Sequence, residues 1–260
     1  MSPVPLSLKQ QQTERSTSTL TSGRRTDLAG KPVKNVILLS ISDDEFGFIR
    51  PHLEYVDLPY HQILHEPGER IEFGYFVNGG LVSLVIVTSD GRSVEIGIVG
   101  KEGFLGAPLA VNVNRSPYRA VVQMAADGLR IRAEVLEESK GFLPQLNLLL
   151  NRYAHIQGLQ VAQLAACNRL HEIEQRLARW LLMSQDRVDS GSLPMTHDFL
   201  AQMLGTGRPS VTLAAGILQK AGMIQYTRGN VKILNRKSLE EAACECYGVI
   251  QNFNGDLGLK

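Results

Sequence analysis

THDFLAQMLGTGRPSVTLAAGILQKAG, residues 196–222, is the most informative part of the chain, because it has the features of two short helices joined by a tight turn. Thr196 suits the N-cap of the first helix, since its hydroxyl can accept a hydrogen bond from an unpaired backbone N–H. Gly205 stands where the chain must reverse, and glycine reaches positive φ at little steric cost. Pro209 suits the start of the second helix, where its missing N–H does no harm. The pattern is typical of a unit that sets its second helix into a DNA groove, although a helical hairpin packed in a core would share part of it.

The second helix, at about residues 208–221, is predicted to bury one face and expose the other. Apolar residues three and four positions apart form the buried face, namely Val211, Ala214, Ala215 and Leu218. The exposed face, the turn before it and the N-cap of the first helix supply the candidates for DNA contact. These candidates are Thr196, Thr206, Arg208, Ser210, Thr212 and Leu213.

A β-hairpin is predicted directly after these helices, in MIQYTRGNVKIL at residues 223–234. Two runs with strand character flank Arg228, Gly229 and Asn230, which are typical of a hairpin turn. Helix, turn, helix and hairpin together make a winged-helix plan. Arg228 and Lys232 lie near the tip of this wing, where they are expected to reach DNA phosphates. A solvated hairpin with unrelated basic residues is the alternative.

Positive charge is concentrated in this part of the chain. The whole sequence has a net charge of +1 and a pI near 7.8, which excludes a basic nucleic-acid coat protein. Between residues 169 and 237 there are ten cations and five anions, a net charge of +5. This imbalance is expected of a module that phosphates attract. With 43% apolar and 20% charged residues among 260, the chain can form two cores, and we expect two domains.

The cysteines are few and widely spaced. Three cysteines, the absence of a signal peptide and the absence of a long apolar run predict a reduced, cytoplasmic protein without a membrane segment. Cys244 and Cys246 form only a CxC pair, and Cys167 is far away in the sequence. A zinc or iron–sulfur site normally needs four suitable ligands. We therefore expect no metal site and partial burial of the thiols.

The N-terminal part of the chain has a different texture. Residues 1–33 are rich in Ser, Thr, Gln, Pro and Gly, and are predicted to form a disordered tail. Residues 34–142 begin with a helical piece and continue with short strand-like runs, at 62–64, 70–77, 81–87, 93–99, 118–125 and 128–132, with turns such as 78–80 and 90–91 between them. This spacing predicts an antiparallel, jelly-roll-like β-barrel in an α+β protein. The interior of such a barrel could hold a small ligand.

A long helix is predicted at 143–167, between this barrel and a winged helix-turn-helix domain at 168–240. Its apolar stripe is longer than a helix that caps a barrel needs, and a parallel partner helix would bury it. The alternative is an unbroken helix packed within a monomer. The predicted dimer-interface residues are Leu146, Leu149, Leu150, Tyr153, Ile156, Val161 and Leu164. Asn168 is predicted to cap a following helix, and residues 241–260 are predicted to be a C-terminal tail.

Three longer passages carry a family resemblance. They are GERIEFGYFVNGGLVSLVIVTSDGRSVEIGIVGKEGFLG at 68–106, AACNRLHEIEQRLARWLLMSQDR at 165–187, and MTHDFLAQMLGTGRPSVTLAAGILQKAGMIQYTRGNVKIL at 195–234. With the order of barrel, long helix and winged helix, they resemble the Crp/Fnr family of bacterial transcription regulators. The resemblance implies a homodimer that binds a partly palindromic site on double-stranded DNA and contacts RNA polymerase.

The resemblance also assigns roles within the second helix. Arg208 matches the family's arginine that pairs with a guanine, a contact worth about 1–3 kcal/mol of discrimination. Ser210 matches a hydroxyl residue that touches phosphate. Pro209 and Leu213 depart from the cAMP receptor protein, which has a glutamate and a second arginine there. A different half-site is expected, in which Leu213 could meet a thymine methyl group.

The effector site implied by the resemblance departs further. The residues that match it are Gly106, Ala107, Arg115, Ser116 and Gln157. The segment at 104–108 lacks the carboxylate that holds a ribose, and Gln157 with the following glycine replaces the hydroxyl pair that reads adenine. We therefore expect no cofactor, an unidentified effector, and no binding of cAMP. The cysteine set of the family's iron–sulfur oxygen sensors is also absent from the N-terminal region.

Two other classes of protein stay open as alternatives. One is a sensor that responds to a cyclic nucleotide or to haem, in which His52, His61 or His65 would be a ligand. The other is a metal-dependent, cupin-like barrel enzyme that uses His61, His65, Glu66 and Glu69. No HxH pair precedes a matching glutamate, and the spacing does not favour such a metal site. We expect a protein without enzymatic activity.

Overall fold

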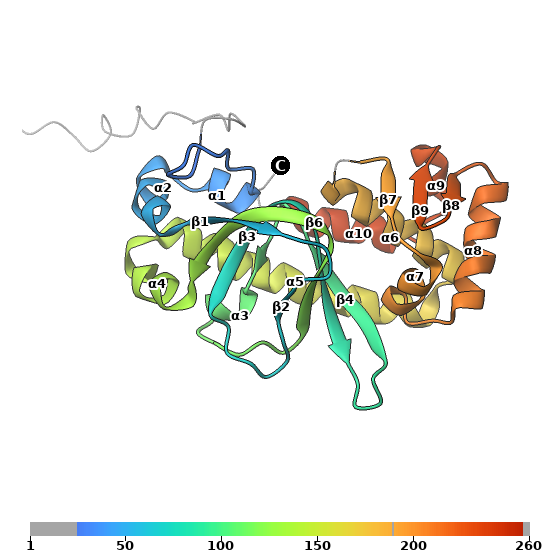
Figure 1. The fold of residues 1–260 in the computed structure, drawn as a ribbon, viewed down its shortest axis with the longest axis horizontal. Helices are drawn as coiled ribbons and strands as arrows, with labels where there is room; N and C mark the ends of the chain where they lie inside the picture. The colour runs from blue at the N-terminus through green and yellow to red at the C-terminus, as the bar shows by residue number, and fades with distance from the viewer. Residues whose placement is uncertain (1–24, 189, 257–260) are drawn as a thin grey trace, which may run out of the picture.

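The computed structural model describes residues 25–188 and 190–256. It has two units, a sheet domain and a C-terminal unit, and the long helix α5 (Pro144–Leu170) runs behind the sheet toward the second unit (Figure 1). In the part of the chain that is described, no helix is long and apolar enough to cross a membrane.

The sheet domain is built on six antiparallel strands. Their bounds are β1 (Glu54–Leu58), β2 (Ile63–His65), β3 (Phe73–Val87), β4 (Ser93–Val99), β5 (Phe104–Leu105) and β6 (Arg119–Arg132). The strand order is β1-β6-β3-β4, with β2 paired to β6 and β5 to β3. The predicted antiparallel strand arrangement is confirmed, but among the described residues the edge strands β1 and β4 do not pair, so the sheet does not close into a barrel. Helices α1 (Val36–Ser40) and α5 contribute apolar side chains to the same core as the strands.

The predicted turn at 78–80 is also wrong, because β3 runs through it without a break. The register of β3 against β6 shifts on both sides of Gly79, as in a bulge. Gly80 has a φ of 85°, and a Cβ there would lie 2.5 Å from the carbonyl oxygen of Ala125. Glycine is needed here because the neighbouring strand passes so close. Likewise, the two runs predicted at 118–125 and 128–132 form the single strand β6.

The beginning of the described chain is packed onto the sheet domain. Asp27 and Val33 are buried, and Arg25 donates to the carbonyl oxygen of Ile41 over 2.7 Å and to Asp43 over 2.8 Å. The predicted disordered tail is therefore wrong for residues 25–33, while residues 1–24 lie outside the described residues. The expected helical piece is α2 (Asp43–Ile49), capped by Ser42.

Short helical segments complete this domain. They are η1 (Arg50–His52), α3 (Ala107–Ala110), α4 (Ala133–Glu138) and η2 (Ser139–Phe142).

Helix α5 corrects the predicted dimer interface. Leu146, Leu149, Leu150, Tyr153 and Ile156 are buried in the core of the sheet domain, and Leu164 is buried in the core of the C-terminal unit. Val161 is half-buried and lines a cavity. The stripe alone predicts a second chain, because the sequence does not show which internal surface covers it. Asn168 lies inside α5 rather than capping the next helix.

The C-terminal unit has the predicted winged-helix arrangement. Its elements are α6 (Ile173–Val188), β7 (Ser192–Pro194), α7 (His197–Met203), α8 (Arg208–Lys220), β8 (Ile224–Thr227), β9 (Asn230–Ile233) and α9 (Arg236–Ala242). The three strands form a sheet in the order β7-β9-β8. The predicted C-terminal tail is wrong, because α10 (Cys246–Asp256) packs against α5 with Ile250 fully buried.

Candidate nucleic-acid interface

The turn between α7 and α8 has the geometry that its residues predict. The hydroxyl of Thr196 accepts from the backbone N–H of Phe199 over 3.2 Å, which satisfies a donor that the helix leaves free. Gly205 has a φ of 59°, the left-handed conformation expected at the reversal. Pro209 lies in the first turn of α8. The predicted buried face of α8 is buried, at Val211, Ala214, Ala215 and Leu218.

The opposite face of α8 is open to solvent along its whole length. It forms a shallow groove of about 660 Å³, lined by Arg208, Pro209, Thr212, Leu213, Gly216, Ile217 and Lys220. Leu213 is 67% exposed and Ile217 is 48% exposed, so neither supports the core of its own subunit. Gly216 leaves open space in which another backbone could approach. Cations at both ends and apolar residues between them suit a helix that enters a DNA groove.

Arg208 is held loosely at the start of this face. Its guanidinium pairs with the carboxylate of Asp198 over 3.2 Å, and both side chains are about two-thirds exposed, at 65% and 66%. An exposed ion pair contributes at most about 1 kcal/mol, because water screens the charges. The arginine can therefore exchange Asp198 for a base edge at little cost.

Sequence reasoning missed His197, which joins α8 to the wing. Its ring stacks on Tyr226 of β8 with centroids 3.9 Å apart, and its Nδ1 lies 3.0 Å from the hydroxyl of Thr212. That hydroxyl donates to the carbonyl oxygen of Arg208 over 3.0 Å, so His197 acts as the donor. Burial, and then the charge of Arg208, lower the pKa of His197 and favour the neutral ring. Thr212 thus lies on the exposed face, but its hydroxyl already has two partners.

The remaining candidates lie around α8. Arg228 is exposed in the turn between β8 and β9. The adjacent Gly229 is close to Thr196, since a Cβ added at Gly229 would lie 4.0 Å from Cγ2 of Thr196. Lys232 is exposed on β9, and Ser210 is half-buried in the first turn of α8. Thr206 is half-buried and lines a different groove, which faces the turn between β3 and β4. The fold therefore brings the tip of the wing and the cap of α7 together and sets Thr206 apart.

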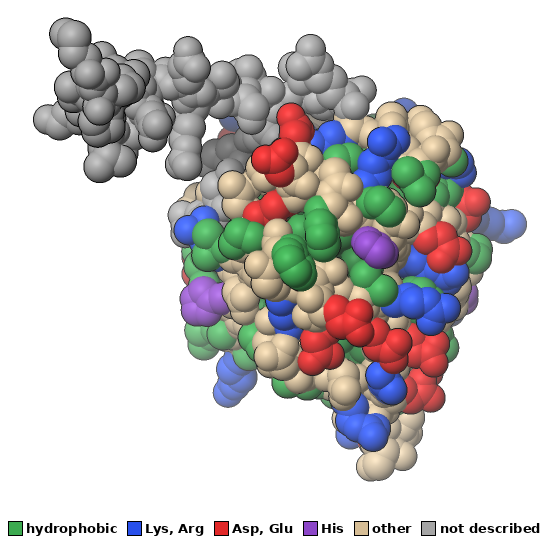
Figure 2. Space-filling view, turned by 90° about the vertical axis from the view of Figure 1, so that its left-hand side faces the viewer, with side chains coloured by type: hydrophobic (Ala, Val, Ile, Leu, Met, Phe, Trp, Pro, Cys, Tyr) green, Lys and Arg blue, Asp and Glu red, His purple; other side chains and the backbone are tan. Residues whose placement is uncertain are grey.

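The net charge of +5 between residues 169 and 237 is larger than the positive charge exposed on the surface of this region, because several of its cations are buried or paired. Arg176, Arg179 and Arg187 are buried on α6. Arg236 is neutralised by Asp186 and Glu240, at 2.7 and 2.8 Å. The exposed cations of this region are Arg169, Arg208, Lys220, Arg228, Lys232 and Lys237. By contrast, the far end of the sheet domain carries interspersed acidic, basic and apolar side chains with no continuous basic surface (Figure 2).

The C-terminal unit is docked on the sheet domain through a buried carboxyl group. Glu95 of β4 accepts from the indole N–H of Trp180 over 2.6 Å and from the hydroxyl of Ser83 over 2.5 Å. Burial raises the pKa of Glu95 to about 7, although these hydrogen bonds and the charges of Arg179 and Arg187 lower it. Beside it, Gly205 lies against Val94, where a Cβ would come within 2.9 Å. The reversal between α7 and α8 is thus in contact with the sheet domain.

The structure divides the candidate effector residues. Ala107 and Gln157 line a cavity of about 230 Å³ between the sheet, α3 and α5, and Gly106 precedes it as the N-cap of α3. Arg115 is exposed and donates to the carbonyl oxygen of Gly68 over 2.7 Å. Ser116 donates within its own turn to the carbonyl oxygen of Tyr118 over 2.6 Å. Neither residue lines the cavity, and none of the described residues that line it is a cation.

The histidines of the sheet domain do not form a ligand set. The Nε2 of His65 lies 3.0 Å from the carbonyl oxygen of Phe73, and burial lowers the pKa of this ring. His52 and His61 are exposed, and Glu66 pairs with Arg119 over 3.0 Å. The residues of the cupin-like alternative are not among the metal-ligand groupings found in the described ranges.

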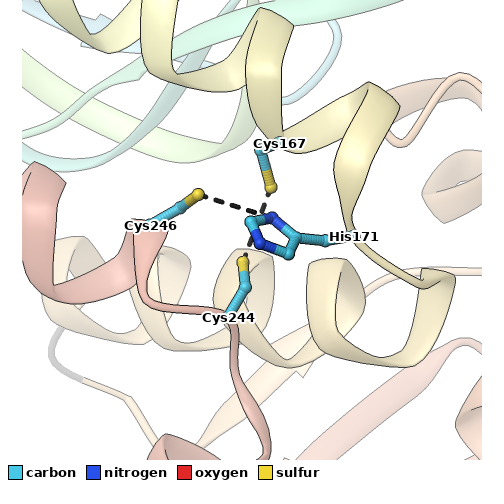
Figure 3. Close-up of side chains that lie close together, drawn as sticks. All are labelled: Cys167, His171, Cys244 and Cys246. Atoms are coloured by element: carbon cyan, nitrogen blue, oxygen red, sulfur yellow. Dashed lines mark hydrogen bonds between the residues drawn. The ribbon is translucent and has the colours of Figure 1, made fainter.

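A possible metal-ligand set forms elsewhere, where α5, α6 and α10 meet (Figure 3). This cysteine–histidine cluster consists of Cys167, His171, Cys244 and Cys246, whose ligand atoms all lie within 4.8 Å of one another. Although Cys167 is far from the CxC pair in sequence, the fold brings it beside that pair, which the sequence did not predict. Its Sγ lies 3.5 Å from the Sγ of Cys244, 77 positions along the chain. All three thiols are buried, where partial burial was predicted.

Comparisons with known proteins agree with this architecture. The family model of the Crp-like helix-turn-helix domain matches residues 175–242, and that of the cyclic nucleotide-binding domain matches residues 55–139. The chain is similar to the transcriptional regulator SdrP of Thermus thermophilus. The two are 30% identical over 186 residues, which cover 68% of this chain and 86% of SdrP.

Solved structures share the fold at lower identity. The structure of FixK2 from Bradyrhizobium japonicum has a TM-score of 0.64 and 17% identity, and the match covers 74% of this chain and 98% of that one. A transcriptional regulator of the Crp/Fnr family from Eubacterium rectale has a TM-score of 0.63 and 18% identity, with 78% and 94% covered.

Proposed function

Because this chain belongs to the Crp/Fnr family of DNA-binding transcription regulators, we propose that it reads a partly palindromic operator as a homodimer. The observation that carries the proposal is the open face of α8, which begins with a loosely paired arginine and continues with two exposed apolar side chains. A two-fold protein places two such helices in successive major grooves, about one helical turn apart.

The residues of α8 favour a particular half-site chemistry. Arg208 donates to O6 and N7 of a guanine in this proposal, and Leu213 and Ile217, about one and a half and two and a half turns further along the helix, contact thymine methyl groups. Arg228 and Lys232 of the wing contact phosphates, as does Ser210 at the start of α8. Thr196 and Thr206 contribute less to DNA binding in this proposal, since the hydroxyl of Thr196 caps α7 and Thr206 faces the sheet domain.

The dimer in this proposal uses a different face of α5 from the one that the sequence indicates. The sheet domain covers one side of the helix in its N-terminal half, and α10 covers that side in its C-terminal half. The opposite side carries leucine, alanine and polar residues with a seven-residue repeat. Residues on this open face are Leu148, Arg152, His155, Leu159, Ala162 and Ala166. A parallel copy of α5 would bury them in a coiled coil with close backbone approach.

We also propose that the protein contacts RNA polymerase and responds to a small-molecule effector, as the family resemblance implies. The cavity beside Gln157 is smaller than the roughly 300–1,000 Å³ of common ligand sites. Because its described lining lacks a cation to bind a phosphate, we propose that cAMP is not the effector. The residues that line this cavity do not support an enzymatic reaction. We propose that the regulator acts without a catalytic cofactor.

Selection of bound DNA from a random library tests the proposal. The expected result is an inverted repeat whose half-site contains a conserved guanine, bound by two chains per duplex. Affinity for this site should fall steeply as salt rises, because phosphate contacts release counterions. A single asymmetric site bound by one chain would contradict the dimer, and the absence of any enriched sequence would contradict specific reading by α8.

A further inference from the structure

We propose that the cysteine–histidine cluster binds one Zn²⁺ ion, which fastens the C-terminal segment to the junction between α5 and α6. Two of its residues belong to this junction, since Cys167 lies in the last turn of α5 and His171 caps that helix. The other two lie at the start of α10, where Cys246 is the first helical residue and Cys244 comes two positions earlier. The four side chains converge from both segments (Figure 3).

The spacing of the ligand atoms fits a single tetrahedral ion. Zinc bonds of about 2.3 Å to sulfur and about 2.0–2.1 Å to nitrogen hold two sulfurs about 3.8 Å apart, and a sulfur and a nitrogen about 3.6 Å apart. The two sulfurs of Cys167 and Cys244 are 3.5 Å apart. The sulfur of Cys246 is 3.6 Å from Nδ1 of His171. An iron–sulfur cluster would hold ligands on different irons further apart than the 4.8 Å that contains all four ligand atoms here, because iron and sulfide lie between them.

The surroundings orient the ligands as they do in metal sites. The Nδ1 of His171 points at the sulfurs while its Nε2 lies 3.1 Å from the carboxylate of Glu245. A carboxylate that accepts from the second ring nitrogen fixes the tautomer of a metal-bound imidazole. The side-chain amide of Gln163 donates to the sulfur of Cys246 over 3.0 Å, which suits a sulfur that carries negative charge.

The charge of the occupied site would also be balanced. Zn²⁺ with three thiolates and a neutral imidazole carries one net negative charge. Arg179, only 3% exposed, acts electrostatically on the sulfurs of Cys167 and Cys244. Arg176 is buried nearby, and neither arginine forms an ion pair with a carboxylate among the described residues. A buried guanidinium needs such a counter-charge. The buried carboxyl group of Glu95, on which Arg179 also acts, has a pKa raised to about 7 and supplies only part of it.

Three thiolates and one imidazole select zinc by chemical class. Soft sulfur ligands disfavour Mg²⁺, Ca²⁺ and Mn²⁺, which prefer oxygen. Four protein ligands leave no open position, so the ion is structural and does not activate water. The site links α10 to the joint between the long helix and the winged-helix unit, and it therefore stabilises the angle at which that unit is held.

Metal analysis of the full-length protein, purified under reducing conditions from zinc-supplemented medium, tests the proposal. We expect close to one zinc per chain. Cys246→Ser should lose most of this zinc, whereas His52→Asn, which removes an exposed histidine of the sheet domain, should keep it. Glu245→Gln retains all four ligands and should bind zinc about 10–100-fold more weakly, because only the support of His171 is lost.

A second measurement uses the wild-type protein, so that its result does not depend on whether a variant folds. Metal-free protein is loaded with Co²⁺, and the visible bands of tetrahedral cobalt and the charge-transfer bands of thiolate ligands are recorded. We expect both sets of bands, displaced by one equivalent of Zn²⁺, together with protection of all three thiols from alkylation. Absence of bound zinc and of these bands would overturn the proposal, as would stoichiometric iron and sulfide. A resident disulfide between Cys167 and Cys244 would also overturn it.

Discussion

The C-terminal unit and the sheet domain differ in how their candidate sites are built. On α8, the residues of the site are neighbours in sequence, and one exposed face presents them together. In the sheet domain, the candidate effector residues come from three segments, and only those on α3 and α5 reach the cavity. A site carried by one helix follows from the period of that helix, whereas a cavity depends on long-range packing.

The exposed face of α8 and the cavity of the sheet domain also differ in the chemistry of their residues. The exposed face of α8, from Arg208 to Lys220, is the proposed reading surface, and it carries a cation at each end and apolar residues between them. The cavity of the sheet domain has a described lining without a cation for a phosphate. The two regions meet at Glu95, a carboxyl group buried between them. The two regions are connected structurally by the joint around α5 and α6 and by this contact.

Ala162→Glu should have the largest effect, because it separates the two reading surfaces from each other. The side chain is exposed on the open face of α5, so the subunit should stay folded. Two facing carboxylates in a dimer would cost several kcal/mol. We expect a monomer by analytical ultracentrifugation and loss of operator binding. Leu28→Glu, an equivalent change on the sheet domain, should remain dimeric, and a dimeric Ala162→Glu protein would refute the assigned face.

Arg208→Ala tests the reading surface itself. Loss of a bidentate contact to guanine costs about 1–3 kcal/mol per half-site, and a dimer loses two such contacts. Competition binding should show a large loss on the operator and a small one on scrambled DNA. Lys220→Ala, at the other end of the same face, should weaken both DNAs about equally. An equal loss on both DNAs for Arg208→Ala would remove its assigned role.

Glu95→Gln tests the contact between the two regions through its pH dependence. The pKa of Glu95 is raised from 4.5 to about 7, so the folded protein binds a proton that the unfolded chain releases. Its contribution to stability is therefore present below about pH 4.5 and is lost as the pH rises to about 7, by roughly 3 kcal/mol.

Glutamine can accept from the indole N–H of Trp180 with its oxygen and donate to the hydroxyl oxygen of Ser83 with its amide group, but it does not titrate. Urea unfolding at pH 5 and pH 8 should show a smaller fall in the free energy of unfolding for Glu95→Gln than for the wild type. Other groups titrate in both proteins, and Arg179 and Arg187 face the site in both, so the difference isolates Glu95. Parallel pH profiles would show that the carboxyl group is ionised throughout this range.

Arg228→Ala should have a smaller effect, spread over all DNA sequences. Loss of one phosphate contact per wing lowers the salt slope of binding by about 1 for each subunit. Filter binding at several salt concentrations measures this slope. Arg70→Ala on the sheet domain should leave it unchanged, and a sequence-dependent loss for Arg228→Ala would mean that the wing reads bases.

Addition of cAMP should have no effect at all, which sharpens the contrast between the two regions. A ligand at 100 times its dissociation constant would stabilise the protein by about 2.7 kcal/mol. We expect an unchanged unfolding midpoint and unchanged affinity for the operator in excess cAMP. A rise in the unfolding midpoint would show that the cavity opens to admit a phosphate.

Sequence reasoning predicted the winged helix well because its signals are local. Thr196, Gly205 and Pro209 each meet a backbone requirement within a few positions, and β8 and β9 lie within one residue of the predicted runs. The sheet domain was predicted less well. Glycines at 79 and 80 indicated a turn, but they serve a bulge within β3, since a close neighbouring strand and a reversal both require glycine.

The dimer interface and the cysteines were mispredicted for a related reason. The apolar stripe of α5 required a partner surface, and periodicity does not distinguish the protein's own sheet from a second chain. His197 carried no sequence signal beyond its place after the N-cap, and its role depends on a ring of the wing 29 positions away.

The amino-acid sequence by itself determined the helices, the reversal at Gly205, the wing and the family. These depend on backbone conformations and hydrogen bonds between residues that are close along the chain. Only the tertiary structure decided which face of α5 stays open, that Glu95 is buried between the two units, and that Cys167 meets Cys244. Such contacts form where distant segments pack to bury apolar surface, and no short pattern in the chain encodes that distance.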